Sequence, residues 1–211
     1  MLLDADDCQL VLVDYQTRLM PAIFENELVV ANAVRLARMA QALQVPVWGT
    51  EQTPDKLGPN VDAVRVAIDA AGGRTLVKTH FSAVADGLGD WLRPPARKPA
   101  PADQIRGNAR SLPKHLQCPQ PEEDTGPSTI VIAGCEAHVC LLQTALDLLE
   151  EEFEVWVVTD ACSSRSERNR DAAFDRLAGN GAELVTTEMV AFEWLRTAEH
   201  EAFKEILGLV K

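Results

Sequence analysis

Short runs of apolar residues alternate along the chain with longer amphipathic stretches. Six short runs are rich in β-branched residues and are bounded by polar residues or glycine; they lie at residues 10–13, 45–48, 75–77, 129–133, 154–158 and 183–185. Each run is too uniformly apolar for a strand with one face in water. Such continuous apolar runs are typical of strands inside a parallel sheet. The pattern therefore predicts six buried parallel strands.

The stretches between these runs show helical periodicity. Apolar residues recur at helical spacing in residues 28–43, and residues 139–149 and 167–177 each combine an apolar face with a charged one. Such alternation of strands and helices predicts the α/β class. We expect residues 1–211 to form a single domain, a three-layer α/β/α sandwich with a parallel sheet of about six strands.

Residues 93–128 break this alternation. The segment is rich in proline and has little apolar periodicity, so it predicts a surface insertion that is mobile and dispensable for folding. Its composition favours a solvated loop. An interaction arm or an active-site lid is the alternative.

Charge and hydropathy narrow the classes of partner. The net charge of −12 disfavours nucleic acid, because phosphate binding needs clustered lysine and arginine, and the best basic stretch, residues 93–98, lies in the insertion. No apolar run approaches the length of a bilayer, so no membrane partner is expected. The first residues lack the features of a secretory signal or a transit peptide. We expect a cytoplasmic protein, with an organellar location left open.

The chain contains five cysteines, Cys8, Cys118, Cys135, Cys140 and Cys162. An odd number without an export signal predicts reduced thiols, and the absence of a C-x-x-C pair gives a zinc site little support. Cys8, Cys135 and Cys162 are expected to be packing or loop thiols. Cys118 falls in the insertion.

Reactive side chains follow several predicted strands directly. Asp14 follows the first strand and Lys78 the third, and Cys140 lies in the first turn of the helix after the fourth. Ligands bind beyond the carboxyl ends of parallel strands, so these groups are expected to meet there. The helix dipole and Lys78 would favour the thiolate of Cys140, and Asp14 would carry the proton. Free backbone N–H groups would bind an oxyanion.

Each of the three residues also has a structural interpretation. A buried cysteine at a helix start is often a small packing residue, Asp14 could cap a turn, and Lys78 could be a surface lysine. The combination favours a catalytic triad, because a triad is recognised by the joint roles of its members.

Further residues at the same edge are candidates for a substrate pocket: Tyr15, Gln16, Gln52, Phe81 and His138. His138 and His80 each fit a pocket donor as well as a surface or capping residue. A small neutral or anionic amide, drawn by the charge of Lys78, is the expected substrate.

Several motifs, in chain order, resemble those of the isochorismatase-like cysteine hydrolases. V-D-Y-Q at 13–16 is similar to the family's aspartate motif and V-K-T-H-F-S-A at 77–83 to its lysine motif. I-V-I-A-G-C-E-A-H-V-C-L-L-Q-T-A-L-D-L-L at 130–149 is similar to the nucleophile motif, and V-V-T-D-A-C-S-S-R at 157–165 also matches. The E-A-H-V-C wording and T-E-Q after the second strand resemble the isochorismatase-domain-containing hydrolases most. The resemblance covers nearly the whole chain apart from the insertion.

The resemblance implies a triad of Asp14, Lys78 and Cys140 that hydrolyses a small-molecule amide-type C–N bond or an acyl bond without a cofactor. It implies a cis peptide between Cys135 and Glu136, with backbone N–H groups near Glu136 and Cys140 directed at the oxyanion. Members of the family commonly form homo-oligomers, so at least a dimer is expected.

Other activities are less well supported. Nicotinamidases, a branch of this superfamily, bind a metal through an Asp and His residues after the second strand, but no His lies between Thr50 and Thr79 here. No metal is therefore expected, and Asp55 and Asp62 could bind a cation only weakly. Two alternatives stay open: a catalytically silent scaffold or interaction protein, and a nucleic-acid-processing protein.

Overall fold

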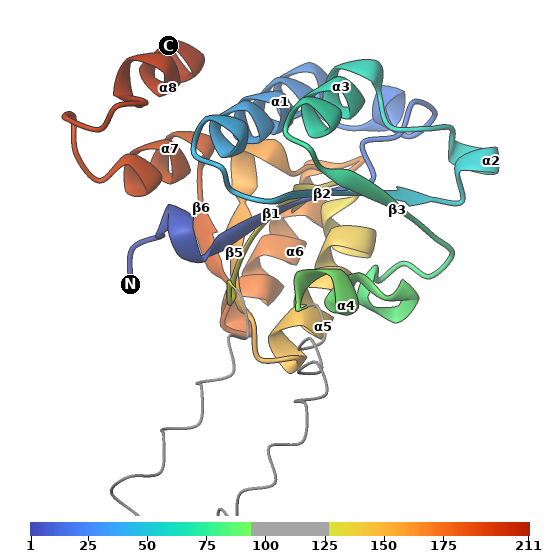
Figure 1. Cartoon of the computed structure of the whole chain (residues 1–211). Coiled ribbons are helices and arrows are strands. Elements are labelled where there is room, and N and C mark those ends of the chain that lie inside the picture. The colour runs from blue at the N-terminus through green and yellow to red at the C-terminus, as the bar shows by residue number, and fades with distance from the viewer. Residues whose placement is uncertain (94–126) are drawn as a thin grey trace, which may run out of the picture.

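A parallel sheet forms the centre of the molecule. The computed structural model describes residues 1–93 and 127–211, and its six strands are arranged in the order β3-β2-β1-β4-β5-β6. They are β1 (Cys8–Val13), β2 (Val47–Gln52), β3 (Arg74–Lys78), β4 (Thr129–Gly134), β5 (Glu154–Val158) and β6 (Glu183–Val185). The predicted α/β fold with a parallel sheet is confirmed (Figure 1).

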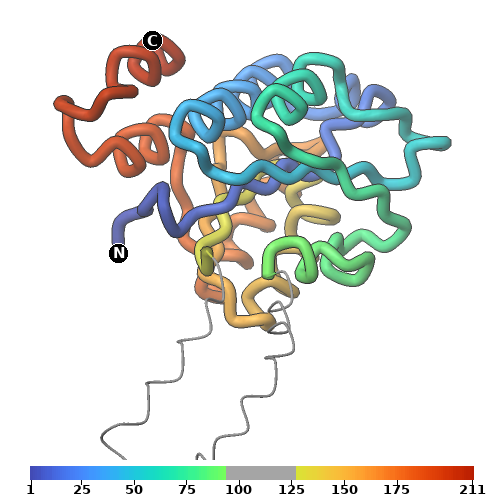
Figure 2. Tube along the Cα trace, in the orientation of Figure 1, coloured from blue at the N-terminus to red at the C-terminus, as the bar shows by residue number. Residues whose placement is uncertain are grey.

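Helices cover both faces of this sheet (Figure 1). One face carries α1 (Asn26–Ala42) and α3 (Asp62–Ala70), and the other carries α4 (Leu88–Leu92), α5 (Leu142–Glu150) and α6 (Glu167–Gly179). The short α2 (Pro54–Leu57) follows β2, and α7 (Thr187–Leu195) and α8 (Phe203–Val210) pack against α1. Both termini lie at the end of the molecule away from α2 (Figure 2). None of the helices in the described ranges is long and apolar enough to cross a membrane.

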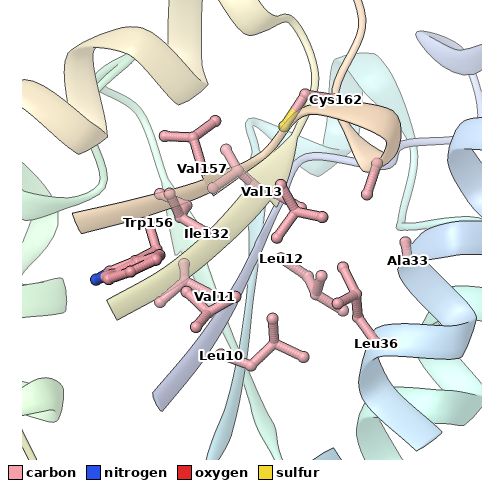
Figure 3. Packing of buried hydrophobic residues seen from close by; sticks show 14 of the residues in the cluster. Leu10, Val11, Leu12, Val13, Ala33, Leu36, Ile132, Trp156, Val157 and Cys162 are labelled. Carbon is pink, nitrogen blue, oxygen red and sulfur yellow. The ribbon is translucent and has the colours of Figure 1, made fainter. Parts of the chain in front are cut away.

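The two central strands, β1 and β4, are buried along their whole length. Alternate side chains of a strand point to opposite faces, and Leu10 and Leu12 of β1 pack toward Ala33 and Leu36 of α1 (Figure 3). Burying each leucine contributes about 1.5–3 kcal/mol, and a shift by one residue would expose them. The packing therefore fixes the point at which β1 ends, directly before Asp14.

Two strands differ most from their prediction. The second strand was expected at residues 45–48, but β2 continues to Gln52, because its polar residues find partners: Thr50 bonds to Asp14, Glu51 accepts from the Asn60 amide, and Gln52 accepts from Lys78. The third strand is not buried as predicted. It forms one edge of the sheet, and its Val77 side chain is 58% exposed.

The predicted insertion at residues 93–128 lies outside the described residues except at its ends. Gln9, at the start of β1, donates from Nε2 to the carbonyl oxygens of Leu92 at 2.9 Å and Pro127 at 3.2 Å. The segment thus joins the described chain at the amino ends of the strands. The candidate catalytic residues follow the carboxyl ends.

Candidate active site

The strands on either side of β2 each end in a charged side chain. Lys78 is the last residue of β3, and Asp14 follows β1 with a φ of 53°, a left-handed conformation that is uncommon outside glycine. Lys78 Nζ lies 2.7 Å from Asp14 Oδ2, and both side chains are fully buried. Removing two charges from water is unfavourable, and strained residues cluster at functional sites, so this pair is a strong candidate for function.

The two oxygens of the Asp14 carboxylate have different surroundings. Oδ1 accepts a hydrogen bond of 2.7 Å from Thr50 Oγ1 on β2. Oδ2 faces the ammonium of Lys78 and forms no hydrogen bond of good geometry with any described residue. Oδ2 is therefore the oxygen that is available to accept a proton.

The ammonium of Lys78 is enclosed by acceptors. It donates to Gln52 Oε1 at 2.8 Å and to the carbonyl oxygens of His80 at 3.3 Å and Phe81 at 3.0 Å. Gln52 is itself held in place, because its Nε2 donates to the Thr79 carbonyl at 2.7 Å. A lysine ammonium has three protons, and here each has an acceptor within the chain.

Cys140 lies in a single π-helical turn (Ala137–Leu141) that precedes α5. Burial, and after it the Asp14 carboxylate, raise the pKa of its thiol to about 12, although Lys78 acts to lower it. Both side chains are within hydrogen-bonding reach of the sulfur. The thiol is thus neutral at neutral pH. The expected lowering of this pKa by the helix start and Lys78 is outweighed by burial and Asp14.

The backbone before Cys140 is tightly constrained. Gly134 ends β4 with a φ of 156°, and a Cβ atom there would clash with the Val13 carbonyl oxygen, so only glycine fits. The peptide bond between Cys135 and Glu136 is cis. The chain therefore turns sharply between β4 and the π-helical turn.

The backbone N–H groups of Cys140 and Glu136 do not form the i to i−4 hydrogen bond of an α-helix. The Glu136 carbonyl accepts from Val139 N at 3.0 Å and from Leu141 N at 3.3 Å, instead of from Cys140 N. The Glu136 N–H has no hydrogen-bond partner within residues 1–93 and 127–211. Both amides are thus candidates to bind an oxyanion.

Two predicted pocket residues lie in the interior. The Tyr15 hydroxyl donates to the Ala161 carbonyl at 2.6 Å, and Gln16 Nε2 donates to the Gly58 and Gln52 carbonyls at 2.6 and 3.0 Å. Gln16 Oε1 also accepts from the Gln52 amide at 2.9 Å. Both side chains are fully buried, so they hold the strand ends together and are not available to a substrate, which corrects the prediction.

The histidines are held by neighbouring side chains. His138 Nδ1 lies 2.9 Å from Ser164 Oγ, and its Nε2 lies 3.3 Å from Asn169 Nδ2. His80 is 65% exposed and contacts Asp86 at 3.1 Å. These contacts favour the surface interpretation for His80 and a positioning contact with the loop before α6 for His138.

The remaining residues considered from the sequence are Phe81 and the cysteines other than Cys140. Phe81 is 53% exposed and stays a candidate for the pocket. Burial raises the pKa of Cys8 to about 11, that of Cys135 to about 12 and that of Cys162 well above its usual range. These three thiols are 0–2% exposed, against 7% for Cys140, and Cys162 lies in the core (Figure 3). Cys118 lies outside the described residues.

Metal ligands do not gather in the described part of the chain. No group of three or more His, Cys, Asp or Glu side chains is arranged there to hold a metal ion. Asp62, one of the two aspartates considered as weak cation ligands, pairs with Arg65 at 2.6 Å instead.

Comparisons with known proteins agree with this architecture. A family model described as the isochorismatase domain matches residues 122–189. Isochorismatase domain-containing protein 2A of Mus musculus is 35% identical over 202 residues, which cover 96% of this chain and 82% of the mouse protein. MAR1 ribonuclease from Caenorhabditis elegans superposes with a TM-score of 0.77 at 29% identity and covers 100% of this chain and 92% of its own.

Two YcaC proteins are also similar in structure. YcaC from Pseudomonas aeruginosa, solved with hexane-2,5-diol and covalent acrylamide, has a TM-score of 0.76 at 25% identity over 99% of this chain and 91% of its own. YcaC from Escherichia coli, an octameric hydrolase of unknown specificity, has a TM-score of 0.77 at 24% identity over 99% of this chain and 89% of its own; it shows the shared fold. By its identity to the mouse protein over nearly its whole length, the chain belongs to the isochorismatase domain-containing family.

Proposed function

We propose that this chain is a cysteine hydrolase that cleaves the C–N bond of a small amide, or a related acyl bond, with Cys140 as the nucleophile. One observation carries the proposal. The fully buried ion pair between Asp14 and Lys78, 2.7 Å long, lies within reach of the Cys140 thiol and leaves Asp14 Oδ2 free to accept a proton. Membership of the isochorismatase domain-containing family supports a hydrolase scaffold.

The first step forms an acyl-enzyme. Because the thiol is neutral at rest, Asp14 Oδ2 removes its proton as Sγ attacks the carbonyl carbon of the substrate. The C–S bond forms, and the carbonyl electron pair moves to oxygen. When the tetrahedral intermediate collapses, the C–N bond breaks and Asp14 returns the proton to the leaving amine.

The second step releases the acid. Asp14 takes a proton from water, and the hydroxyl group adds to the thioester carbonyl. Collapse breaks the C–S bond, and the sulfur recovers its proton from Asp14. The products are one carboxylic acid and one amine, or ammonia from a primary amide, and no redox partner is needed.

Lys78 and two backbone amides would stabilise the charge that develops. Lys78 lies beside Asp14 and Cys140, so it balances the negative charge that moves between the carboxylate and the sulfur. The amides of Glu136 and Cys140 are suited to bind the oxyanion, because neither makes the bond expected in an α-helix. Loss of one such donor typically lowers kcat by about 10²–10³-fold.

The covalent acrylamide in YcaC from Pseudomonas aeruginosa fits this chemistry. Acrylamide combines a primary amide with an electrophilic alkene, and a thiolate adds to such an alkene. A thiol nucleophile would account for a covalent acrylamide in that protein, and the proposal requires such a nucleophile here. A catalytically silent scaffold is the weaker alternative, and turnover of a substrate that Cys140→Ala abolishes would exclude it.

Replacing Cys140 by alanine should lower turnover of the best amide by about 10³-fold or more, as for other catalytic triads. The measurement is ammonia release from a panel of small amides, ureides and carbamoyl compounds. Cys8→Ala is the matched control, because Cys8 is also a buried thiol but lies at the amino end of β1. Equal activity of the two variants would refute the proposed nucleophile.

The similarity to MAR1 ribonuclease supports a second candidate, cleavage of RNA. The net charge of −12 disfavours it, since phosphate contacts depend on clustered cations. We expect neither RNA cleavage nor RNA binding, measured by gel assay and by a filter-binding titration against salt. Cleavage that Cys140→Ala removes would favour this second candidate over the amidase.

A homo-oligomer, at least a dimer, remains part of the proposal. The Escherichia coli YcaC protein of the same fold is octameric. Light scattering of the purified chain would give its mass in solution.

A further inference from the structure

Two cationic side chains at the proposed site, Lys78 and Arg165, each have a carboxylate partner. Lys78 pairs with Asp14 at 2.7 Å, and its three protons go to acceptors within the chain. Arg165, in the loop before α6, donates from Nε to Glu136 Oε2 at 2.9 Å and from its backbone amide to the same oxygen at 3.1 Å. Glu136 is the residue whose amide would bind the oxyanion.

The loop that encloses Lys78 contributes a further carboxylate, Asp86. In this loop the His80 and Phe81 carbonyl groups accept hydrogen bonds from Lys78. The His80 imidazole contacts Asp86 Oδ1 at 3.1 Å. Asp86 Oδ2 also accepts from the amides of Thr79 and His80 at 2.8 and 2.9 Å. These hydrogen bonds hold the pKa of Asp86 below its usual range, so the carboxylate stays negative.

Resting on the function proposed above, we infer that this site accepts an uncharged small amide and discriminates against an anionic one. A substrate with an anionic group, besides the oxyanion that the Glu136 and Cys140 amides would bind, needs a further cation or donor to replace the water of that group. Lys78 and Arg165 each have a carboxylate partner, and Lys78 has no free proton. The Asp86 carboxylate and the net charge of −12 would instead repel it.

This inference narrows the expectation of a neutral or anionic amide, drawn by Lys78, to a neutral one. The sequence shows a lysine at a strand end, but the structure shows that its charge and its protons already have partners. Two further cations follow neighbouring strands: Arg18 after β1 and Lys56 in α2. Arg18 Nη1 donates to the Lys56 carbonyl at 2.7 Å, and neither side chain forms an ion pair with another described residue.

Two alkylating agents measure the charge preference directly. Iodoacetamide and iodoacetate share their leaving group and differ mainly in charge, so the ratio of their rates at Cys140 reports how the site treats an anion. The same ratio of rates is measured for the neutral thiol 2-mercaptoethanol, and dividing by it corrects for the intrinsic reactivity of the two reagents. At Cys140 the corrected ratio should favour iodoacetamide by at least about tenfold, and the preference should persist at high salt, because buried charges are screened weakly.

Turnover gives an independent readout with matched substrates. Butanamide and succinamate have the same chain length and differ by a terminal methyl against a carboxylate, and butanamide should have the higher kcat/KM. Arg18→Ala and Lys56→Ala are the control variants. Neither should change the alkylation ratio if these two cations do not serve the site.

The outcomes separate this inference from the proposed function. A corrected ratio near one, a preference for iodoacetate, or a higher kcat/KM for succinamate would overturn the inference, while Cys140 would stand as the nucleophile. A ratio that rises further in Lys56→Ala or Arg18→Ala would also contradict it, because these unpaired cations would then be drawing anions to the site. Labelling of Cys140 that is no faster than that of buried Cys135, with both reagents, would contradict the proposed function and the inference with it.

Discussion

Asp14→Asn and Lys78→Met should change the alkylation rate of Cys140 in opposite directions, although both should abolish turnover. Asp14 raises the pKa of the Cys140 thiol and Lys78 lowers it. Removing the carboxylate therefore lowers that pKa and speeds alkylation, and removing the ammonium raises it and slows alkylation. Charges at this distance shift a pKa by about one to three units, so each rate should change by roughly tenfold or more.

The sign of the pH dependence follows from the same argument. With a thiol pKa near 12, the thiolate fraction of the native protein increases with pH throughout the neutral and alkaline range, and so should the rate with iodoacetamide. In Asp14→Asn the same increase should begin at lower pH. Turnover should nevertheless fall by about 10³-fold or more, because no group carries the proton to the leaving amine.

Mass spectrometry of timed digests would follow the thiols together, and Cys8 serves as the internal control. Cys8 lies at the opposite end of β1, so its labelling should not respond to either substitution. Slower labelling of Cys140 in Asp14→Asn would contradict the assignment, since it would mean that the carboxylate promotes the thiolate at rest. The same holds if both substitutions act in one direction.

Lys78→Met alone should lower the free energy of unfolding by about 3–5 kcal/mol, the typical cost of leaving one member of a buried ion pair without its partner. Both side chains are fully buried, so water cannot replace the lost ammonium. The double variant Asp14→Asn, Lys78→Met should recover most of this loss, because an amide at position 14 is uncharged and can still accept from Thr50. Urea denaturation would give the free energy of unfolding of the unchanged chain, of Lys78→Met and of the double variant.

A second ion pair of the chain provides the matched control. Arg65 and Asp62 on α3 lie 2.6 Å apart, but their side chains are 51% and 86% exposed. Arg65→Met should change stability by less than about 1 kcal/mol, since solvent screens exposed pairs. If Lys78→Met proved as mild as Arg65→Met, or if the double variant were no more stable than Lys78→Met, the buried pair would not be the electrostatic unit described here.

The strands were predicted from sequence more reliably than the helices, for a physical reason. A strand buried on both faces is a short apolar run, which is easily recognised, and β5 and β6 were predicted with their observed bounds. In α7, Val190, Ala191, Trp194 and Leu195 are buried while Met189 and Phe192 are partly exposed, so apolar residues occur on all sides and no helical face is visible. No helix was predicted there, nor at α3 or α8.

The edge of the sheet that carries Asp14, Lys78 and Cys140 was also predicted, because parallel strands all end on the same side. The protonation state of the Cys140 thiol was not predicted. A sequence shows that a lysine and a helix start are near, but not how deeply the sulfur is buried, and burial decides the pKa of Cys140. The polar end of β2 was missed for a related reason: Thr50 and Gln52 resemble turn residues until their partners across the sheet are known.

The position of β2 between β1 and β3 also limits which amino acids can complete the site. Neighbouring strands are about 4.8 Å apart, so β1 and β3 are separated by about 10 Å, and a charge on β3 must extend across a whole strand to meet one on β1. The four-methylene side chain of lysine spans most of that gap, and the carboxylate of Asp14 spans the rest. Histidine at the end of β3 would be too short. The geometry of the sheet thus selects the length of the cation, independently of the chemistry that the cation serves.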